Sequence, residues 1–324
     1  MKTYYKGMLR TNLENGVVTV VEAPLPERPA GYALLRLLVA GICNTDLELQ
    51  RGYYGFSGTP GHEFVAEVAE TDDRALVGKR VVGEINLACA HCEWCRKGLG
   101  RHCPNRSVLG IVRHPGAFAE VFTLPEANLH VVPDGLPLDR AVFTEPLAAA
   151  CEILDQVAIP AGAPVAVLGD GKLGLLVAQV LAVHGCAVRL FGRHEEKMRI
   201  AAASGVTTEL AGGKLPVAEF DWVVDATGSP EGLRQAVAMT RPRGTVILKS
   251  TVHGAVAVDT APIIVNELML VGSRCGRFEA ALPLLENPLI RTDEMISVRF
   301  PLRDATQAFQ RAAHRGVLKV LLEV

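Results

Sequence analysis

The sequence of 324 residues predicts an α/β fold in which a doubly wound parallel sheet is combined with a separate, mostly β domain. Three observations lead to this prediction. Residues 147–274 alternate short apolar strand patterns with helical patterns. The first of these strands ends in a glycine-rich turn that opens a helix. Residues 1–146 instead contain short strand patterns separated by Gly and Pro, with few helical patterns.

The glycine-rich turn follows the apolar run VAVL and has the spacing G-x-G-x-x-G, with glycines at Gly169, Gly171 and Gly174. The first glycine allows a tight turn, the second lets the backbone approach a pyrophosphate, and the third lets the helix pack on the strand. The N-terminus of the helix offers unpaired N–H groups to phosphates. We therefore expect a dinucleotide site that includes Lys172 and Leu173 of the same turn. The alternative is a tight turn that binds no ligand.

A second group of chemically active residues lies in the N-terminal part. Cys43 follows the apolar strand pattern Tyr32–Gly41, and His62 and Glu63 open another strand after a glycine-rich loop. A borderline-soft ion such as Zn²⁺ accepts thiolate, imidazole and carboxylate ligands together. Each residue alone would fit a buried core cysteine or a solvated turn. Their combination at element boundaries makes all three candidates for one metal site.

Four further cysteines follow the pattern C-x2-C-x2-C-x7-C, at Cys89, Cys92, Cys95 and Cys103. Four thiolates at this spacing can close a tetrahedral site that leaves no position open for a substrate. We therefore expect a structural metal lobe over residues 86–106. An iron–sulfur cluster is an alternative that such spacing also allows.

The order of these motifs resembles that of the zinc-dependent medium-chain alcohol dehydrogenases over essentially the whole chain. The matching segments are GICNTD at Gly41–Asp46, GHE at Gly61–Glu63, the four-cysteine lobe and the glycine turn. The resemblance implies that Cys43 and His62 hold a catalytic zinc, and that Glu63 ligates this zinc or alternates with water. It also implies that Thr45 receives the proton of the substrate alcohol.

Further positions follow from the resemblance. Glu145 stands where the polyol, sugar and threonine dehydrogenase branch has a Glu-Pro beside the zinc, ligating it directly or through water. Its alternative role is that of an acidic residue in the first turn of a helix. Glu48 replaces a histidine that passes the proton to solvent in many relatives, so either Glu48 is a carboxylate relay or the proton leaves through water. Ala226, Thr227 and Gly228 match a segment that borders the cofactor.

The resemblance also implies a division into three segments. Residues 1–146 form a GroES-like catalytic domain, residues 147–274 form a Rossmann dinucleotide-binding domain, and residues 275–324 return to the catalytic domain. Members of the family are usually dimeric or tetrameric, so we expect a homodimer or homotetramer.

The end of the second strand of the parallel sheet predicts the choice between NAD and NADP. An acidic residue there accepts hydrogen bonds from both hydroxyls of the adenosine ribose and selects NAD. This chain instead has Gly192, Arg193 and His194, with no acid at the strand tip. Gly192 leaves room and Arg193 can pair with a 2′-phosphate, so we expect NADP rather than NAD. The alternative is an exposed Arg193 that stacks on adenine in either cofactor.

Composition and charge argue against other classes of function. The formal net charge is −2, from 33 Lys and Arg against 35 Asp and Glu, and no basic patch indicates a nucleic-acid partner. No apolar stretch reaches the roughly 18 residues of a membrane span, and the N-terminus lacks the apolar core of a signal peptide. We expect a cytoplasmic protein, in which clustered cysteines favour metal binding over disulfides.

Together these features predict a zinc-dependent oxidoreductase. It would transfer a hydride between an alcohol or polyol, or the carbonyl compound in reverse, and NADP or, less favoured, NAD. One catalytic and one structural zinc are expected per chain. The alternatives are a carbonyl or quinone reductase of the same superfamily and a non-catalytic NADP-binding sensor. The complete set of Cys43, His62 and Glu63 disfavours a zinc-free quinone reductase and a sensor.

Overall fold

The chain is described by a computed structural model over residues 7–250 and 255–324. It divides into two compact units. The first consists of Met1–Glu145 and Ile296–Val324, and the second of Pro146–Met295. The predicted fold class, a parallel-sheet domain combined with a mostly β domain, is confirmed. Among the described residues, none of the helices has the length and apolar character needed to span a bilayer.

The first unit is built on a seven-stranded, mostly antiparallel sheet in the order β10-β5-β4-β3-β18-β17, with β9 also paired to β3. Its strands are β3 (Tyr32–Ile42), β4 (Glu63–Glu70), β5 (Arg80–Gly83), β9 (Val121–Pro125), β10 (Leu129–Val131), β17 (Ile296–Pro301) and β18 (Lys319–Glu323). The central strand β3 is buried along much of its length, which explains its nearly continuous apolar sequence. The C-terminal segment supplies β17 and β18, so it completes a sheet that the N-terminal segment begins.

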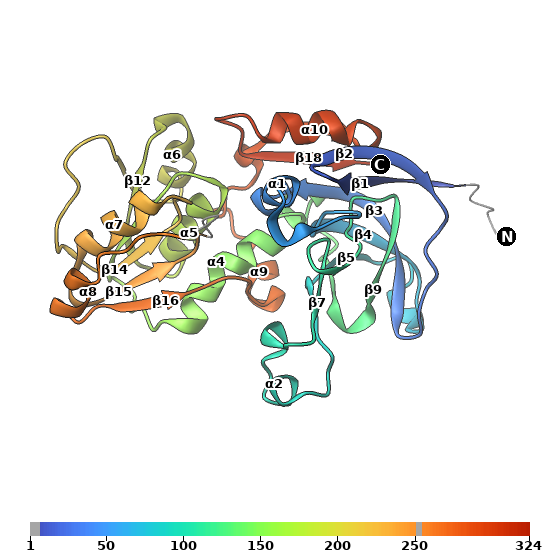
Figure 1. The fold of residues 1–324 in the computed structure, drawn as a ribbon, viewed down its shortest axis with the longest axis horizontal. Helices are drawn as coiled ribbons and strands as arrows, with labels where there is room; N and C mark the ends of the chain where they lie inside the picture. Colours follow the sequence, from blue (N-terminus) through green and yellow to red (C-terminus); the bar gives the residue numbers. More distant parts are fainter. Residues whose placement is uncertain (1–6, 251–254) are drawn as a thin grey trace. The chain divides into compact units, whose positions relative to one another are not determined.

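Smaller elements complete the first unit. The strands β1 (Met8–Glu14) and β2 (Val17–Ala23) form an antiparallel pair, and β6 (Asn86–Leu87), β7 (Ser107–Leu109) and β8 (Arg113–His114) form a small separate sheet. The helices are α1 (Asn44–Gln50), α2 (Glu93–Arg96), α3 (Leu138–Ala141) and α10 (Ala305–Ala312). The 3-10 turns are η1 (Tyr53–Gly55), η2 (Arg74–Leu76), η3 (Gly100–His102), η4 (Glu126–Asn128) and η6 (Leu302–Asp304). Figure 1 shows α2 at the tip of an extension next to β7; this extension is the four-cysteine lobe.

The second unit is a six-stranded parallel sheet in the order β13-β12-β11-β14-β15-β16. Its strands are β11 (Pro164–Leu168), β12 (Ala187–Gly192), β13 (Thr207–Leu210), β14 (Phe220–Asp225), β15 (Thr240–Leu248) and β16 (Met269–Gly272). The helices are α4 (Thr144–Gln156), α5 (Lys172–Val183), α6 (Glu195–Ala202), α7 (Pro230–Met239), α8 (Ala261–Val265) and α9 (Phe278–Leu284), with the 3-10 turn η5 (Asp293–Met295). Figure 1 shows α5, α6 and α7 beside these strands. The strand order reverses between β11 and β14, where sheets of this kind bind ligands.

The chain returns to the first unit at Ile296, later than the expected residue 275. The reason is close packing of residues 275–295 within the second unit. A Cβ atom at Gly276 would stand 1.8 Å from the carbonyl oxygen of Ala148 in α4. Arg277 also donates to Asp155 of α4 at 3.0 Å. These contacts keep α9 with the parallel sheet.

A buried ion pair ties the C-terminal strand to the start of β4. Lys319, the first residue of β18, donates to the carboxylate of Glu63, and both side chains are 1 % exposed. The strand β3 lies between these two strands, with Gly41 opposite Glu63 in the register. A Cβ atom at Gly41 would stand 2.5 Å from Glu63 Oε2 and 3.2 Å from Lys319 Cδ. Gly41 therefore leaves the space in which the ion pair crosses the central strand.

The variant Lys319→Ala will leave the Glu63 carboxylate buried without its charge partner. We expect it to lower the free energy of unfolding by about 3–5 kcal/mol, measured by urea denaturation. The matched control is Arg299→Ala, because Arg299 pairs with Asp139 and Glu323 in partly exposed positions of the same unit. Exposed pairs contribute about 1 kcal/mol or less. Equal losses of stability in the two variants would contradict the importance of the buried pair.

Candidate functional site

The first metal candidate, Cys43, is the N-cap residue of α1. Its N–H donates to Asp46 Oδ2 at 2.8 Å, which fixes the first turn of the helix. The other oxygen of this carboxylate, Oδ1, lies 3.3 Å from Nδ1 of His62. Asp46 is fully buried. One carboxylate therefore orients both the turn that carries the thiol and the imidazole ring, as carboxylates do behind metal-binding histidines.

The structure brings Cys43, His62 and Glu63 together. One ligand atom from each residue lies within 4.8 Å of the other two. His62 and Glu63 are 3 % and 1 % exposed, and Cys43 is half-buried. The Glu63 atom Oε1 is buried and has no hydrogen-bond partner among the described residues. A thiol, an imidazole and an unpartnered carboxylate oxygen at one point fit Zn²⁺.

The electrostatics of this cluster combine burial with close opposite charges. Burial would lower the pKa of His62, but Asp46 and the Cys43 thiol raise it well above its ordinary value. Burial likewise opposes the charge of Lys319, but Glu63 and Cys43 hold the pKa of its amine above the ordinary value. Both shifts arise because acidic groups lie next to the buried His62 and Lys319.

Three more residues are predicted for this site: two lie in α1 next to Cys43, and one lies in α4. Thr45 Oγ1 is 3.7 Å from Cys43 Sγ. Glu48, on the next turn of α1, pairs with Arg51 at 2.6 Å. Glu145 is half-buried in the first turn of α4 and is not part of the three-residue cluster. The relay role of Glu48 and the ligand role of Glu145 stay predictions.

The four cysteines of the lobe also converge. Their sulfur–sulfur distances run from 3.4 Å (Cys92–Cys95) through 3.5 Å (Cys103–Cys89) and 3.7 Å (Cys92–Cys103) to 3.9 Å (Cys89–Cys95). Four sulfurs bound tetrahedrally to Zn²⁺ at about 2.3 Å lie about 3.8 Å apart. The backbone N–H of His91 is the main cause that lowers the pKa of Cys89 to about 6, which favours the thiolate. The donor set thus fits a closed zinc site.

The glycine turn connects β11 to α5. Gly169 has a φ of +109°, and a Cβ atom at Gly174 would stand 1.9 Å from the carbonyl oxygen of Gly169. Gly171 is the N-cap residue of α5, where a Cβ atom would meet nothing within 4 Å. Protein packing therefore explains the first and third glycines but not the second, for which a ligand is the remaining reason. Lys172 and Leu173 form the first turn of α5 and are partly exposed.

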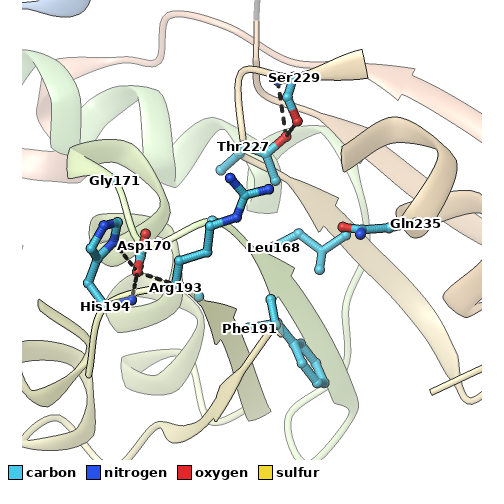
Figure 2. A pocket seen from close by; sticks show the side chains of 13 residues that line it. Leu168, Asp170, Gly171, Phe191, Arg193, His194, Thr227, Ser229 and Gln235 are labelled. Carbon is cyan, nitrogen blue, oxygen red and sulfur yellow. Dashed lines mark hydrogen bonds and ion pairs between the residues drawn. The ribbon is translucent and has the colours of Figure 1, made fainter. Parts of the chain in front are cut away.

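A cavity of about 280 Å³ lies at the carboxyl ends of β11, β12 and β14 (Figure 2). The predicted cofactor residues that line it are Gly169, Gly171, Gly192, Arg193, His194, Ala226 and Thr227. The predicted residues outside its lining are Lys172, Leu173, Gly174 and Gly228. The lining residues that the sequence analysis missed are Leu168, Asp170, Phe191, Ala211, Ser229 and Gln235.

The turn after β14 forms one edge of this cavity. Asp225 accepts hydrogen bonds from the N–H and the hydroxyl of Thr227, at 2.9 Å and 2.8 Å. The N–H of Gly228 donates to Ser250 Oγ at 2.8 Å. These bonds hold the backbone of the turn, and Ala226 and Thr227 line the cavity.

Asp170 is the missed residue that changes the charge of the cavity. Its Oδ2 accepts the N–H groups of Arg193 and His194 at 2.7 Å and 2.6 Å, and lies 2.9 Å from His194 Nδ1. Burial would raise the pKa of Asp170, but these donors hold it below its ordinary value, so the carboxyl is ionised at neutral pH. The available signal is its place within the glycine motif, between Gly169 and Gly171.

The variants Gly174→Ala and Gly171→Ala will separate packing from ligand binding. Gly174→Ala overlaps the Gly169 carbonyl and should lower the free energy of unfolding by about 3 kcal/mol. Gly171→Ala has open space and an ordinary φ of −77°, so stability should change by about 1 kcal/mol or less. Gly171→Ala should still weaken dinucleotide binding about tenfold or more, because the added methyl group would occupy space that the pyrophosphate needs. Thermal unfolding and dinucleotide titration measure the two effects; unweakened binding in Gly171→Ala would count against the predicted site.

The chain is similar to known proteins over most of its length. Residues 29–134 match the family model of the alcohol dehydrogenase GroES-like domain, and residues 173–287 match that of the zinc-binding dehydrogenases. The D-altritol 5-dehydrogenase of Agrobacterium fabrum is 31 % identical over 92 % of this chain and 94 % of that protein. The sorbitol dehydrogenase of Halalkalibacterium halodurans is 26 % identical over 98 % of both proteins.

A solved structure from Sinorhizobium meliloti, which contains NADP, superposes with a TM-score of 0.89 at 28 % identity. The superposition covers 99 % of this chain and 100 % of the Sinorhizobium meliloti chain. The likeness therefore extends over both units. This chain belongs to the zinc-dependent medium-chain alcohol dehydrogenase family, nearer its polyol dehydrogenase branch, and is an NAD(P)-dependent oxidoreductase.

Proposed function

We propose that this enzyme oxidises a polyol or a related alcohol to the carbonyl compound at a zinc ion held by Cys43, His62 and Glu63, with NADP as the preferred hydride acceptor. The observation that carries the proposal is the convergence of a thiol, an imidazole and a carboxylate within 4.8 Å. The relatives named as D-altritol and sorbitol dehydrogenases support a polyol as the substrate class.

The residues around this site hold its ligands ready. A zinc ion bound there would lower the pKa of the substrate hydroxyl or, in reverse, polarise the carbonyl. Asp46 binds the N–H of Cys43 and faces the His62 ring, so the thiol and the imidazole are oriented before an ion arrives. Glu63 can offer the unpartnered Oε1 to the ion while its Oε2 stays with Lys319.

The proton of the substrate alcohol is proposed to pass to Thr45. This hydroxyl is partly exposed and lies 3.7 Å from Cys43 Sγ, next to the proposed metal. From there the proton would move to the carboxylate of Glu48 or directly to water. Glu145 is proposed as a further ligand, directly or through a water molecule.

A second, structural zinc is proposed in the four-cysteine lobe. The sulfur–sulfur distances leave room for one tetrahedral ion and for no additional ligand. We also propose a cytoplasmic location, because free thiolate ligands persist in a reducing compartment. Fractionation of the producing cells tests this location.

NADP is proposed because of Arg193. This residue is exposed and lines the cavity, and its guanidinium has no partner among the described residues. Figure 2 shows the guanidinium directed away from Asp170 and toward Thr227. A guanidinium can bind a 2′-phosphate through charge-assisted hydrogen bonds. The NADP in the Sinorhizobium meliloti structure supports this choice.

The variant Cys43→Ser tests the proposed function. Wild-type protein should contain two zinc ions per chain and oxidise sorbitol or altritol faster with NADP than with NAD. Cys43→Ser should lose one zinc per chain and at least about 100-fold in turnover, because it removes a direct ligand. Metal analysis and the absorbance of reduced cofactor measure these changes.

Cys186→Ala is the matched control for this experiment. Cys186 is a buried cysteine of the second unit outside both clusters, so its variant should keep both zinc ions and full turnover. Unchanged turnover in Cys43→Ser would contradict a catalytic metal at this cysteine. At most one zinc in the wild type would contradict the paired sites, and a strong preference for NAD would contradict the role of Arg193.

We further propose that the protein forms a homo-oligomer through β16. This edge strand pairs only with β15 among the described residues. Its residues Met269 and Leu270 are 58 % and 42 % exposed, and Ile264 and Val265 of α8 are 71 % and 79 % exposed. An exposed apolar edge strand invites pairing with another chain. A second copy related by two-fold symmetry would pair the two β16 strands and cover both apolar surfaces.

The variant Leu270→Lys should disrupt this assembly, because it places a charge on each side of the paired edge. We expect light scattering to give a multiple of 34.7 kDa for the wild type and 34.7 kDa for the variant. Val217→Lys, which changes another exposed apolar residue of the second unit, should leave the mass unchanged. A monomeric wild type would rule out the proposed assembly.

A further inference from the structure

We propose that Asp170 is a specificity-determining residue for the adenosine ribose of the dinucleotide, and that its carboxylate limits the preference for NADP over NAD. This inference rests on the proposed function and concerns the same cavity. In this view Arg193 attracts a 2′-phosphate, whereas Asp170 occupies the hydrogen-bond donors that such a phosphate would otherwise use.

The donors in question are two backbone amides at the end of β12. The N–H groups of Arg193 and His194 both point at Asp170 Oδ2, at 2.7 Å and 2.6 Å (Figure 2). They stand at the N-terminus of α6, for which His194 is the N-cap residue without a side-chain cap of its own. Free amides at a helix N-terminus bind anions such as phosphate. Here a carboxylate of the same chain, only 8 % exposed, already accepts the two amides that lead into the helix.

The absence of an acid at the end of β12 is a consequence of this arrangement. A Cβ atom at Gly192 would stand 2.7 Å from Asp170 Cβ and 2.8 Å from its Oδ2. Glycine is therefore required at position 192 to admit the Asp170 side chain. In this proposal the space beside Gly192 is filled by the Asp170 carboxylate, which comes from the glycine turn and not from the end of β12.

Asp170 acts differently on the free ribose of NAD and on the 2′-phosphorylated ribose of NADP. The three contacts of Asp170 all use Oδ2, and no described residue donates to Oδ1. Oδ1 can accept a hydrogen bond from a ribose hydroxyl of NAD, but it repels a 2′-phosphate. Arg193 compensates for this repulsion with its guanidinium. The cavity is thus built to accept both cofactors, with a preference set by the balance of these two side chains.

The experiment measures dissociation constants of NADPH and NADH, by nicotinamide fluorescence, for the wild type, Asp170→Asn and Arg193→Gln. Asp170→Asn keeps the shape of the side chain and removes its charge. We expect it to shift the affinity ratio toward NADPH about tenfold, the scale of one unit charge near another at a protein surface. Arg193→Gln should shift the ratio toward NADH. Asp221→Asn, which removes a carboxylate of the second unit outside the cavity, should leave both affinities unchanged.

Each outcome decides the inference. An unchanged ratio in Asp170→Asn, or equal weakening of both cofactors, would overturn it while leaving the proposed function intact. Failure of the wild type to bind either cofactor would overturn the proposed function as well. If Asp170→Asn unfolds, Asp170→Ser takes its place, because a serine side chain is smaller and likewise carries no charge.

Discussion

The buried ion pair between Lys319 and Glu63 is the interaction on which the first unit depends. Removing two charges from water is costly, so such a pair persists only where the backbone holds both groups in place. Here β3 lies between the two strands, and Gly41 leaves the necessary space. Because Glu63 also belongs to the candidate catalytic cluster, the position of the last strand of the chain determines the charge of a site assembled near its beginning.

The features that could be predicted from the sequence are those whose cause is local. The glycine turn must bring a strand, a tight bend and a helix into a few residues, so Gly169 and Gly174 reveal it. The lobe must bring four sulfurs to one point, and a short segment from Cys89 to Cys103 achieves this. The alternation of strands and helices likewise predicts the parallel sheet.

The features that could not be predicted depend on which strands lie side by side. Lys319 looks like an ordinary charged residue at the start of a strand, but it is buried where β18 lies between β3 and β17. The strand β13 (Thr207–Leu210) is partly exposed at an edge of the sheet, so it lacks a strong apolar pattern. The return of the chain at Ile296 depends on packing between α9 and α4, which no local pattern records.

Asp170 shows why a spacing rule alone is a weak guide to cofactor choice. The rule considers only the residue at the end of the second strand. A ribose hydroxyl can donate a hydrogen bond to any carboxylate that reaches the same point, whichever segment carries it. In a parallel sheet the turn after β11 lies next to the end of β12, because the strands are neighbours in register. A side chain from that turn can therefore replace one from the strand, provided that a glycine such as Gly192 admits it. The chemical identity of the site follows from the charges that converge there, whichever strand supplies them.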